Sequence, residues 1–232
     1  MFHAQILTLF PEFFEAPLAC SIPRRAIDAG IIRVDCVQIR DFATDKHHRV
    51  DDTPYGGGPG MVMKPDPVVA AIRHSRKSHP QTHVVLLTPT GEALKQAKVR
   101  EFTEMPGITL ICGRYEGIDE RVTDFVDGQL SVGEFVLSGG EPAALCVLDA
   151  VIRMLPGALG DSGSVQQDSY GEDGMLDWPH YTRPEEFEGR RVPDVLLSGN
   201  HAAIEAWRRE QARARSAQEK PQEYGKPEAD EC

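Results

Sequence analysis

The sequence predicts an α/β domain built on a mostly parallel β-sheet. Short apolar runs alternate along the chain with segments of helical periodicity, which is the element order of such folds. Several of these runs end directly at turns that contain glycine or proline, as strands of an open α/β sheet often do. The chain has 232 residues, of which 41% are hydrophobic, so it is long enough to bury a core of this kind.

The individual elements are predicted from periodicity and from turn residues. A buried strand is expected over Phe2–Leu9, and a short helix over Ser21–Ala29 with Ser21 as its cap and Gly30 as its stop. A helix over Pro65–Ser78 has prolines in its opening turn, where proline is tolerated. The other predicted strands are Ile32–Cys36, His83–Leu87, Ile108–Cys112 and Val132–Leu137, and the other predicted helices are Glu92–Thr103, Ile118–Val126 and Glu141–Leu155.

The C-terminal third predicts a different organisation. Residues 158–174 combine glycine, serine and aspartate without periodicity, which is typical of a flexible linker. Helical segments at Pro184–Phe187 and Asn200–Ser216 predict a small α-helical domain, and the polar end of the chain predicts a disordered tail. The expected parts are 1–157 for the α/β domain, 158–174 for the linker, 175–217 for the helical domain and 218–232 for the tail.

Charge and cysteine content narrow the class of protein. The formal net charge of −11 argues mildly against a nucleic-acid partner, but basic residues cluster at 46–49, 73–77 and 208–215, and the acidic tail lowers the total. The five cysteines include no CxxC pair, which favours reduced thiols over disulfides or a zinc site. The sequence shows no signal peptide and no apolar run of ~20 residues, which predicts a soluble, cytoplasmic protein without a membrane partner.

Glycine- and proline-containing turns follow successive apolar runs at 86–91, 112–117 and 136–141. Because ligands of an open α/β sheet bind at the carboxyl ends of its strands, these turns predict a pocket for a nucleoside-like cofactor. Ordinary turns also contain these residues, so composition alone leaves that second interpretation open. The chain lacks GxGxxG, P-loop, HExxH and GxSxG motifs, which weighs against kinases, zinc hydrolases and α/β-hydrolases.

A long loop is predicted over Asp41–Lys64. Its central part, Asp51–Met61, is so rich in glycine and proline that regular structure is not expected there. A stiff loop with few side chains can lie against a ligand backbone or a partner chain, and long loops in compact domains are often functional. A plain surface loop is the alternative.

Several segments occur in the order and spacing of one enzyme family. They are Leu9–Pro11, Asp51–Met61, Cys112–Val122 (CGRYEGIDERV), Val136–Glu141 (VLSGGE), His180–Pro184 (HYTRP) and Val195–Ala202 (VLLSGNHA). On these segments, which extend over about residues 1–208, the chain resembles the bacterial tRNA (guanine-N1)-methyltransferases of the TrmD type. The resemblance implies methylation of N1 of guanine 37 in tRNA, with S-adenosyl-L-methionine as the methyl donor.

The resemblance also implies the fold, the assembly and the cofactor site. The fold would be of the SPOUT type, with a deep trefoil knot that no pattern of strands and helices would suggest. Family members are homodimers whose active sites are shared between two chains. The residues that match the cofactor loops are Leu87, Thr88, Pro89, Gly113, Tyr115, Glu116, Gly117, Val132, Gly133, Glu134, Phe135, Val136, Leu137, Gly139 and Gly140.

Two further matches carry the chemistry that the resemblance implies. Asp168 corresponds to the aspartate that removes the proton from guanine N1, and Arg153 to the arginine that stabilises negative charge at guanine O6. Without the resemblance, Asp168 would be interpreted as a polar residue of a loop and Arg153 as a solvated cation at the end of a helix. The linker would become ordered when tRNA binds and would carry Asp168 over the flipped base.

The predicted contacts with tRNA are Gly58, Arg183 and Ser198, together with the basic face of the last helix. Family members tend to require magnesium. No ligand cluster with metal spacing is visible in the sequence, although Glu116, Asp168 and Asp177 could contribute ligands. The sequence departs from the family after about Arg208, where an acidic end replaces a longer basic helical region, and by a proline shifted by one position after Glu141.

Two other functions are weighed against this one. The first is a knotted methyltransferase with another RNA target, such as a ribose 2′-hydroxyl. The second is an RNA-binding protein that has kept the fold and lost the reaction. Asp168 favours N1 chemistry over the first, and its presence together with Arg153 and the cofactor loops argues against the second.

Overall fold

The computed structural model describes residues 1–159, 168–171 and 174–218. The chain divides into two compact units, Met1–Ser162 and Gly163–Cys232. Across the described parts of both units, every helix is too short or too polar to cross a membrane. The candidate site is built in the first unit.

A parallel sheet forms the centre of the first unit. Its strand order is β2-β1-β6-β5-β7, and every neighbouring pair runs parallel. The strands are β1 (Phe2–Thr8), β2 (Ile32–Gln38), β5 (His83–Ala93), β6 (Gly107–Cys112) and β7 (Gly128–Ser131). The predicted α/β architecture with a parallel sheet is therefore confirmed.

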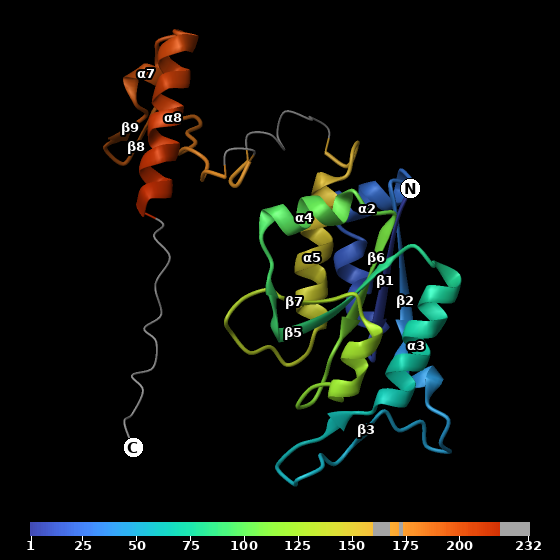
Figure 1. Ribbon diagram of the computed structural model, residues 1–232. Coiled ribbons are helices and arrows are strands. Elements are labelled where there is room, and N and C mark those ends of the chain that lie inside the picture. The colour runs from blue at the N-terminus through green and yellow to red at the C-terminus, as the bar shows by residue number, and fades with distance from the viewer. Residues whose placement is uncertain (160–167, 172–173, 219–232) are drawn as a thin grey trace, which may run out of the picture. The chain divides into compact units, whose positions relative to one another are not determined.

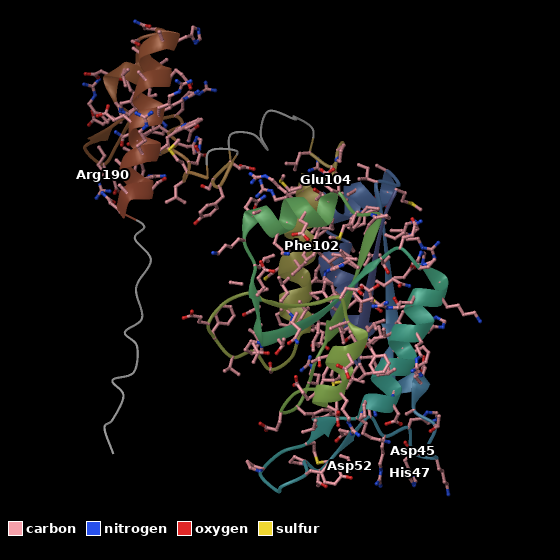
Figure 2. All side chains as sticks on the ribbon, in the orientation of Figure 1. Asp45, His47, Asp52, Phe102, Glu104 and Arg190 are labelled. Atoms are coloured by element: carbon pink, nitrogen blue, oxygen red, sulfur yellow. The ribbon has the colours of Figure 1, made fainter. Side chains whose placement is uncertain are left out.

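One face of the sheet is covered by α2 (Ser21–Asp28), α4 (Gln96–Thr103) and α5 (Glu141–Met154), together with the short η1 (Pro11–Phe14) and α1 (Glu15–Leu18). Alternate residues of the strands point to this side: Ala4 and Ile6 of β1 belong to its core cluster. Helix α4 lies on this side of the sheet (Figure 1). Its Phe102 is 2% exposed and packs into the same cluster (Figure 2).

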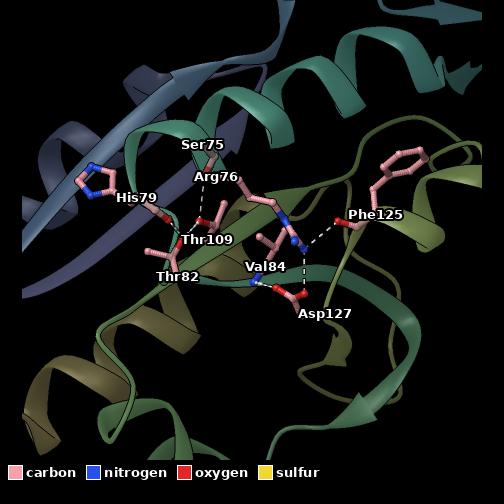
Figure 3. A network of polar contacts seen from close by, with 8 residues as sticks. All are labelled: Ser75, Arg76, His79, Thr82, Val84, Thr109, Phe125 and Asp127. Carbon is pink, nitrogen blue, oxygen red and sulfur yellow. Dashed lines mark hydrogen bonds and ion pairs between the residues drawn. The ribbon is translucent and has the colours of Figure 1, made fainter.

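The opposite face packs against α3 (Pro65–Ser78), η2 (Ile39–Phe42) and η3 (Glu120–Phe125). This core also contains buried polar groups, of which several are hydrogen-bonded to one another (Figure 3). The Ser75 hydroxyl donates to the Gln5 side chain and lies 3.0 Å from the Thr109 hydroxyl, which is 2.9 Å from that of Thr82. These bonds satisfy polar groups that would be costly to bury alone.

A hairpin leaves this side of the unit. It consists of β3 (Asp51–Asp52) and β4 (Val62–Met63), which pair antiparallel and flank the glycine-rich segment. Gly56, Gly57, Gly58 and Gly60 all have positive φ, a conformation that glycine adopts without steric cost. The sequence predicted a loop over all of Asp41–Lys64, and the structure corrects this by placing η2, β3 and β4 partly within it.

Several other predicted boundaries are wrong. Glu92 and Ala93 belong to β5, because they pair with Leu130 and Ser131 of β7, so helix α4 begins only at Gln96. Residues 132–137 are not a strand, because β7 ends at Ser131, where its pairing with β5 also ends. The predicted helix Ile118–Val126 is a shorter 3-10 helix, and Ser21 is not a cap, since Cys20 holds the capping position of α2 without a side-chain bond.

The described part of the second unit, residues 168–171 and 174–218, contains two helices and a small hairpin. Helices α7 (Asp194–Leu197) and α8 (His201–Gln218) confirm helical structure in this part of the chain. The predicted helix Pro184–Phe187 is wrong: β8 (Glu186–Phe187) pairs with β9 (Arg190–Arg191) across a turn at Gly189, which has a φ of +76°. The predicted disordered tail lies outside the described residues after Gln218, as does most of the predicted linker.

Candidate functional site

A pocket with a volume of about 410 Å³ opens beside the bulged middle of β5 and at the carboxyl ends of β6 and β7. Three segments form most of its wall: residues 86–90, 113–118 and, apart from Glu134, 129–140. In an open α/β sheet this is the edge at which ligands bind, because the loops after the strands converge there. The volume lies within the range of small-molecule and cofactor pockets.

The first wall is a bulged part of β5. Leu130 of β7 is the register partner of both Leu87 and Glu92, so the residues between them are looped out of the ladder. Gly91 is required there, because a Cβ at this position would overlap the backbone of Leu130. The hydroxyls of Thr88 and Thr90 lie 3.0 Å apart on the bulge. The bulge presents backbone groups and hydroxyls to the pocket.

The second wall follows β6. Tyr115 and Gly117 have positive φ, and the turn that they form is held from outside by the glycine-rich hairpin. The Glu116 N–H donates to the Met61 carbonyl at 2.9 Å, and the Met63 N–H donates to the Gly117 carbonyl at 2.9 Å. The hairpin thus supports this wall through its backbone.

The third wall is the loop between β7 and α5. Phe135, Val136 and Leu137 are exposed, with Val136 at 91%, so apolar side chains are available to a ligand. Gly140 lies against the second wall: its N–H donates to the Gly113 carbonyl at 2.9 Å, and a Cβ on it would lie 2.7 Å from the Cα of Cys112. The two walls therefore meet at a place where only glycine fits.

The structure brings the predicted cofactor residues together. All of them line the pocket except Glu134, which lies in the third loop without contributing to the lining. Leu86, Thr90, Arg114 and Ser138 of the lining lie in the turns predicted to form the pocket, although none was singled out as a cofactor residue. The lining also contains residues outside those turns that sequence reasoning missed: Ile118, Glu120, Thr123, Gln129, Leu130, Ser131 and Ala143. Arg114 and Ser138 stood inside the quoted motifs CGRYEGIDERV and VLSGGE, which was the available signal.

The remaining predicted site residues are distributed over both units. Arg153 is half-buried in the last turn of α5, and Gly58 lies near the tip of the hairpin, where a Cβ would meet open space. Asp168, Arg183 and Ser198 belong to the second unit. Arg183 is exposed, and the Ser198 hydroxyl donates to the Val195 carbonyl at the end of α7.

Charged groups around the pocket are held in defined positions. Arg121 donates to Asp119 from Nε and Nη2, at 2.8 and 2.7 Å, and this lowers the pKa of the Asp119 carboxyl. Burial raises the pKa of Cys112 well above its ordinary value, so this thiol stays neutral beneath the pocket. Within residues 1–159, 168–171 and 174–218, no three His, Cys, Asp or Glu side chains gather into a group that could hold a metal ion.

Comparison with known proteins adds a family. The family model described as tRNA (guanine-1)-methyltransferase TrmD matches residues 2–226. A tRNA (guanine-N(1)-)-methyltransferase of Mesorhizobium japonicum is 50% identical over 226 residues, covering 97% of both chains. Proteins with the same name from Geobacter sulfurreducens and Persephonella marina are 53% and 47% identical, over 89% and 94% of this chain and 84% and 85% of their own lengths.

Proposed function

Since the chain belongs to the tRNA (guanine-1)-methyltransferase family, it is a methyltransferase that acts on guanine N1 in tRNA, and we propose that it modifies guanine 37 with S-adenosyl-L-methionine as the methyl donor. The observation that carries the proposal is the convergence of the family-matched loops on a single pocket. A pocket of about 410 Å³ is large enough for a nucleoside with an amino-acid side arm.

The composition of the pocket fits this donor. Close packing at Gly140 brings the backbones of the second and third walls together, and backbone groups there can hydrogen-bond the edge of an adenine. Leu137 and Phe135 offer apolar contact to the flat ring. Glu116, whose carboxylate lies against Gly60 of the hairpin, is an acidic residue of the lining, and its proposed role is to attract the cationic group of the donor. When bound, S-adenosyl-L-methionine supplies an already activated methyl group on a sulfonium, so the protein must supply position and a proton acceptor.

We assign the proton transfer to Asp168 and the stabilisation of charge to Arg153. Guanine N1 carries a proton at neutral pH and becomes an effective nucleophile when that proton is removed. Asp168 would accept it as the methyl group is transferred. The Arg153 guanidinium would donate to O6, where negative charge develops as N1 is deprotonated. The support for both roles is their match to the family motifs.

The tRNA would be held by backbone and phosphate contacts. Gly58 at the hairpin and Arg183 and Ser198 in the second unit are the proposed contact residues, because they lie in the family-matched segments. A homodimer with shared active sites, a cytoplasmic location and the trefoil knot complete the proposal. In the sheet, β5 lies between β6 and β7, so the chain must cross β5 as it passes from β6 to β7. Such a crossover is compatible with a knot. We also propose that methyl transfer requires magnesium ions, so a chelator should lower the rate of transfer.

The decisive experiment is methyl transfer from labelled S-adenosyl-L-methionine to a tRNA transcript with guanine at position 37. A matched transcript with another base at that position serves as the control. Label in the first transcript alone is expected. Equal label in both would move the target elsewhere, as in a ribose 2′-hydroxyl methyltransferase. Cofactor binding without any label would instead favour an RNA-binding protein that has lost the reaction.

A further inference from the structure

Arg114 lines the pocket, but neither cofactor binding nor proton transfer as described above uses its side chain. It follows Gly113 at the end of β6, and its side chain is 21% exposed. Its Nε lies 2.9 Å from Oε2 of Glu141, whose side chain is fully buried at the first turn of α5. Among the described residues these two atoms make no aligned hydrogen bond, so the contact is an ion pair.

Glu141 is itself fixed by the first strand. The hydroxyl of Thr8, at the end of β1, donates to Oε1 of Glu141 at 2.8 Å and accepts from the Phe10 N–H at 2.9 Å. The Phe10 ring lies beside the Arg114 guanidinium, with Cζ 4.5 Å from the ring centroid. The Leu9–Pro11 motif thereby gains a structural role: it sets the place of the ion pair.

The guanidinium also reaches the third wall of the pocket. Its Nη1 donates to the Ser138 carbonyl at 3.1 Å, and a Cβ on Gly139 would overlap the Arg114 side chain. A single arginine therefore contacts a buried carboxylate on one side and the main chain of the pocket wall on the other. A planar guanidinium with several fixed N–H groups can make both contacts, whereas an ammonium group acts as one point charge.

We propose that Arg114, held by Glu141, is a positioning residue that fixes the Ser138–Gly140 wall in the shape that binds the methyl donor. The proposal deepens the proposed function and rests on it, because the ligand of the pocket is taken to be S-adenosyl-L-methionine. Arg114 acts through the backbone of its neighbours and needs no contact with the reacting atoms.

The buried surroundings decide how the role can be tested. Burial, and next the charge of Glu141, raise the pKa of the nearby Cys112 thiol, which marks a poorly solvated region. Removing only Arg114 would leave the Glu141 charge buried without compensation, and the protein could lose its fold for that reason. A useful variant therefore keeps the positive charge or removes both charges together.

The test is Arg114→Lys in the full-length protein, with the dissociation constant for S-adenosyl-L-methionine measured by calorimetry without tRNA. Loss of the bond to Ser138 is expected to weaken binding about tenfold, which corresponds to one hydrogen bond with a charged donor. The KM for the cofactor should rise similarly, while kcat at saturating cofactor stays within about twofold, since the wall still adopts the binding shape when occupied. If Arg114 served only the stability of the fold, the variant would not show a raised KM together with an unchanged kcat.

Arg76→Lys is the matched control. Arg76 also joins a carboxylate to a backbone carbonyl, because its Nη2 donates to Asp127 at 2.8 Å and to the Phe125 carbonyl at 3.2 Å, but it is not part of the pocket lining (Figure 3). The affinity of the Arg76→Lys protein for S-adenosyl-L-methionine should equal that of the wild type. The double variant Arg114→Met with Glu141→Gln removes both charges, and it should fold and still bind the cofactor weakly.

The outcomes separate the two proposals. Wild-type affinity in both the Arg114→Lys protein and the folded double variant would overturn the role of Arg114 and leave the proposed function intact. Absence of S-adenosyl-L-methionine binding by the wild-type protein itself would overturn the proposed function, and this inference with it. Weakened binding in both variants, with unchanged binding by Arg76→Lys, would establish the role.

Discussion

Asp168 is the residue on which the proposed proton transfer depends. Replacing it by alanine removes the acceptor for the N1 proton, so methyl transfer should fall by about 10²-fold or more. Cofactor affinity should stay within about twofold, because the lining residues 86–143 belong to the first unit and Asp168 to the second. Single-turnover transfer and calorimetry measure the two quantities. Asp194→Ala, at an exposed position of the same unit, is the control, and near-normal turnover by Asp168→Ala would remove Asp168 from its assigned role.

Gly140 tests the packing between two walls of the pocket. In Gly140→Ala the new Cβ would lie 2.7 Å from the Cα of Cys112 and 3.0 Å from the Gly113 nitrogen, so backbone must move. Cofactor affinity is expected to fall about tenfold or more, since both walls are displaced. Gly128→Ala is the matched control, because its Cβ would meet only the His83 ring at an ordinary 3.6 Å. Equal affinities for the two variants would contradict this account of the site.

The sequence predicted these glycines better than it predicted Arg114. Glycine at 139 and 140 stands out in any sequence, and its use is local: the backbone must approach another chain segment. Arg114 was one residue of a quoted motif without an assigned task. Its task depends on Glu141 and Thr8, which are distant in sequence and come together only when β1, β6 and α5 pack. Local pattern carries no information about such a contact.

Asp127 shows how a loop residue can join two elements. Its Oδ2 accepts from the Val84 N–H of β5 at 2.8 Å, and its Oδ1 accepts from Arg76 of α3 at 2.8 Å (Figure 3). Asp127→Ala should lower the free energy of unfolding by about 1–2 kcal/mol, most of it from the N–H left without its acceptor, since the ion pair is partly exposed. Urea denaturation measures the change. Asp124→Ala, at an exposed position nearby, should change it by less than about 0.5 kcal/mol.

Element boundaries were predicted well where an element is long and periodic. Helix α3 begins and ends where the prolines and the periodicity predict, and the buried strands β1 and β6 are close to the predicted runs. The errors fall where pairing between distant segments decides the structure. Glu92 is extended because it pairs with β7, and residues 132–137 are irregular because the pairing of β7 with β5 ends at Ser131. Neither fact is visible in the residues themselves.

The stability of the whole molecule should depend on pH through His3. Its ring lies 4.7 Å from that of His79, and burial, then the charges of His79, Arg33 and the N-terminus, lower its pKa below the ordinary 6.5, with Asp35 opposing. The unfolded chain therefore binds a proton more readily than the folded one between these two pKa values. The contribution of His3 to the free energy of unfolding is therefore present well above pH 6.5 and is lost as the pH falls from there through the lowered pKa of the folded state.

Comparing the wild type with His3→Gln tests this dependence. Urea denaturation at several pH values below 7 should show a smaller decline for the variant, since it has no proton to take up at this site. His47→Gln, in an exposed loop (Figure 2), should decline as the wild type does. If the free energy of unfolding of His3→Gln declined with pH as steeply as that of the wild type, other groups would produce the pH dependence.

The pocket and the proposed base belong to different units of the chain, and this can be tested with a fragment. Every residue that lines the described pocket lies in Met1–Ser162, whereas Asp168, Arg183 and Ser198 lie in Gly163–Cys232. A fragment of residues 1–162 should therefore fold and bind S-adenosyl-L-methionine within a few-fold of the full-length affinity, yet transfer no methyl group, because it lacks the proposed base. Circular dichroism establishes folding, and calorimetry and labelled transfer measure the rest. A folded fragment that had lost cofactor binding would show that the second unit contributes to the pocket, and a fragment that still methylated tRNA would show that the base lies in the first unit.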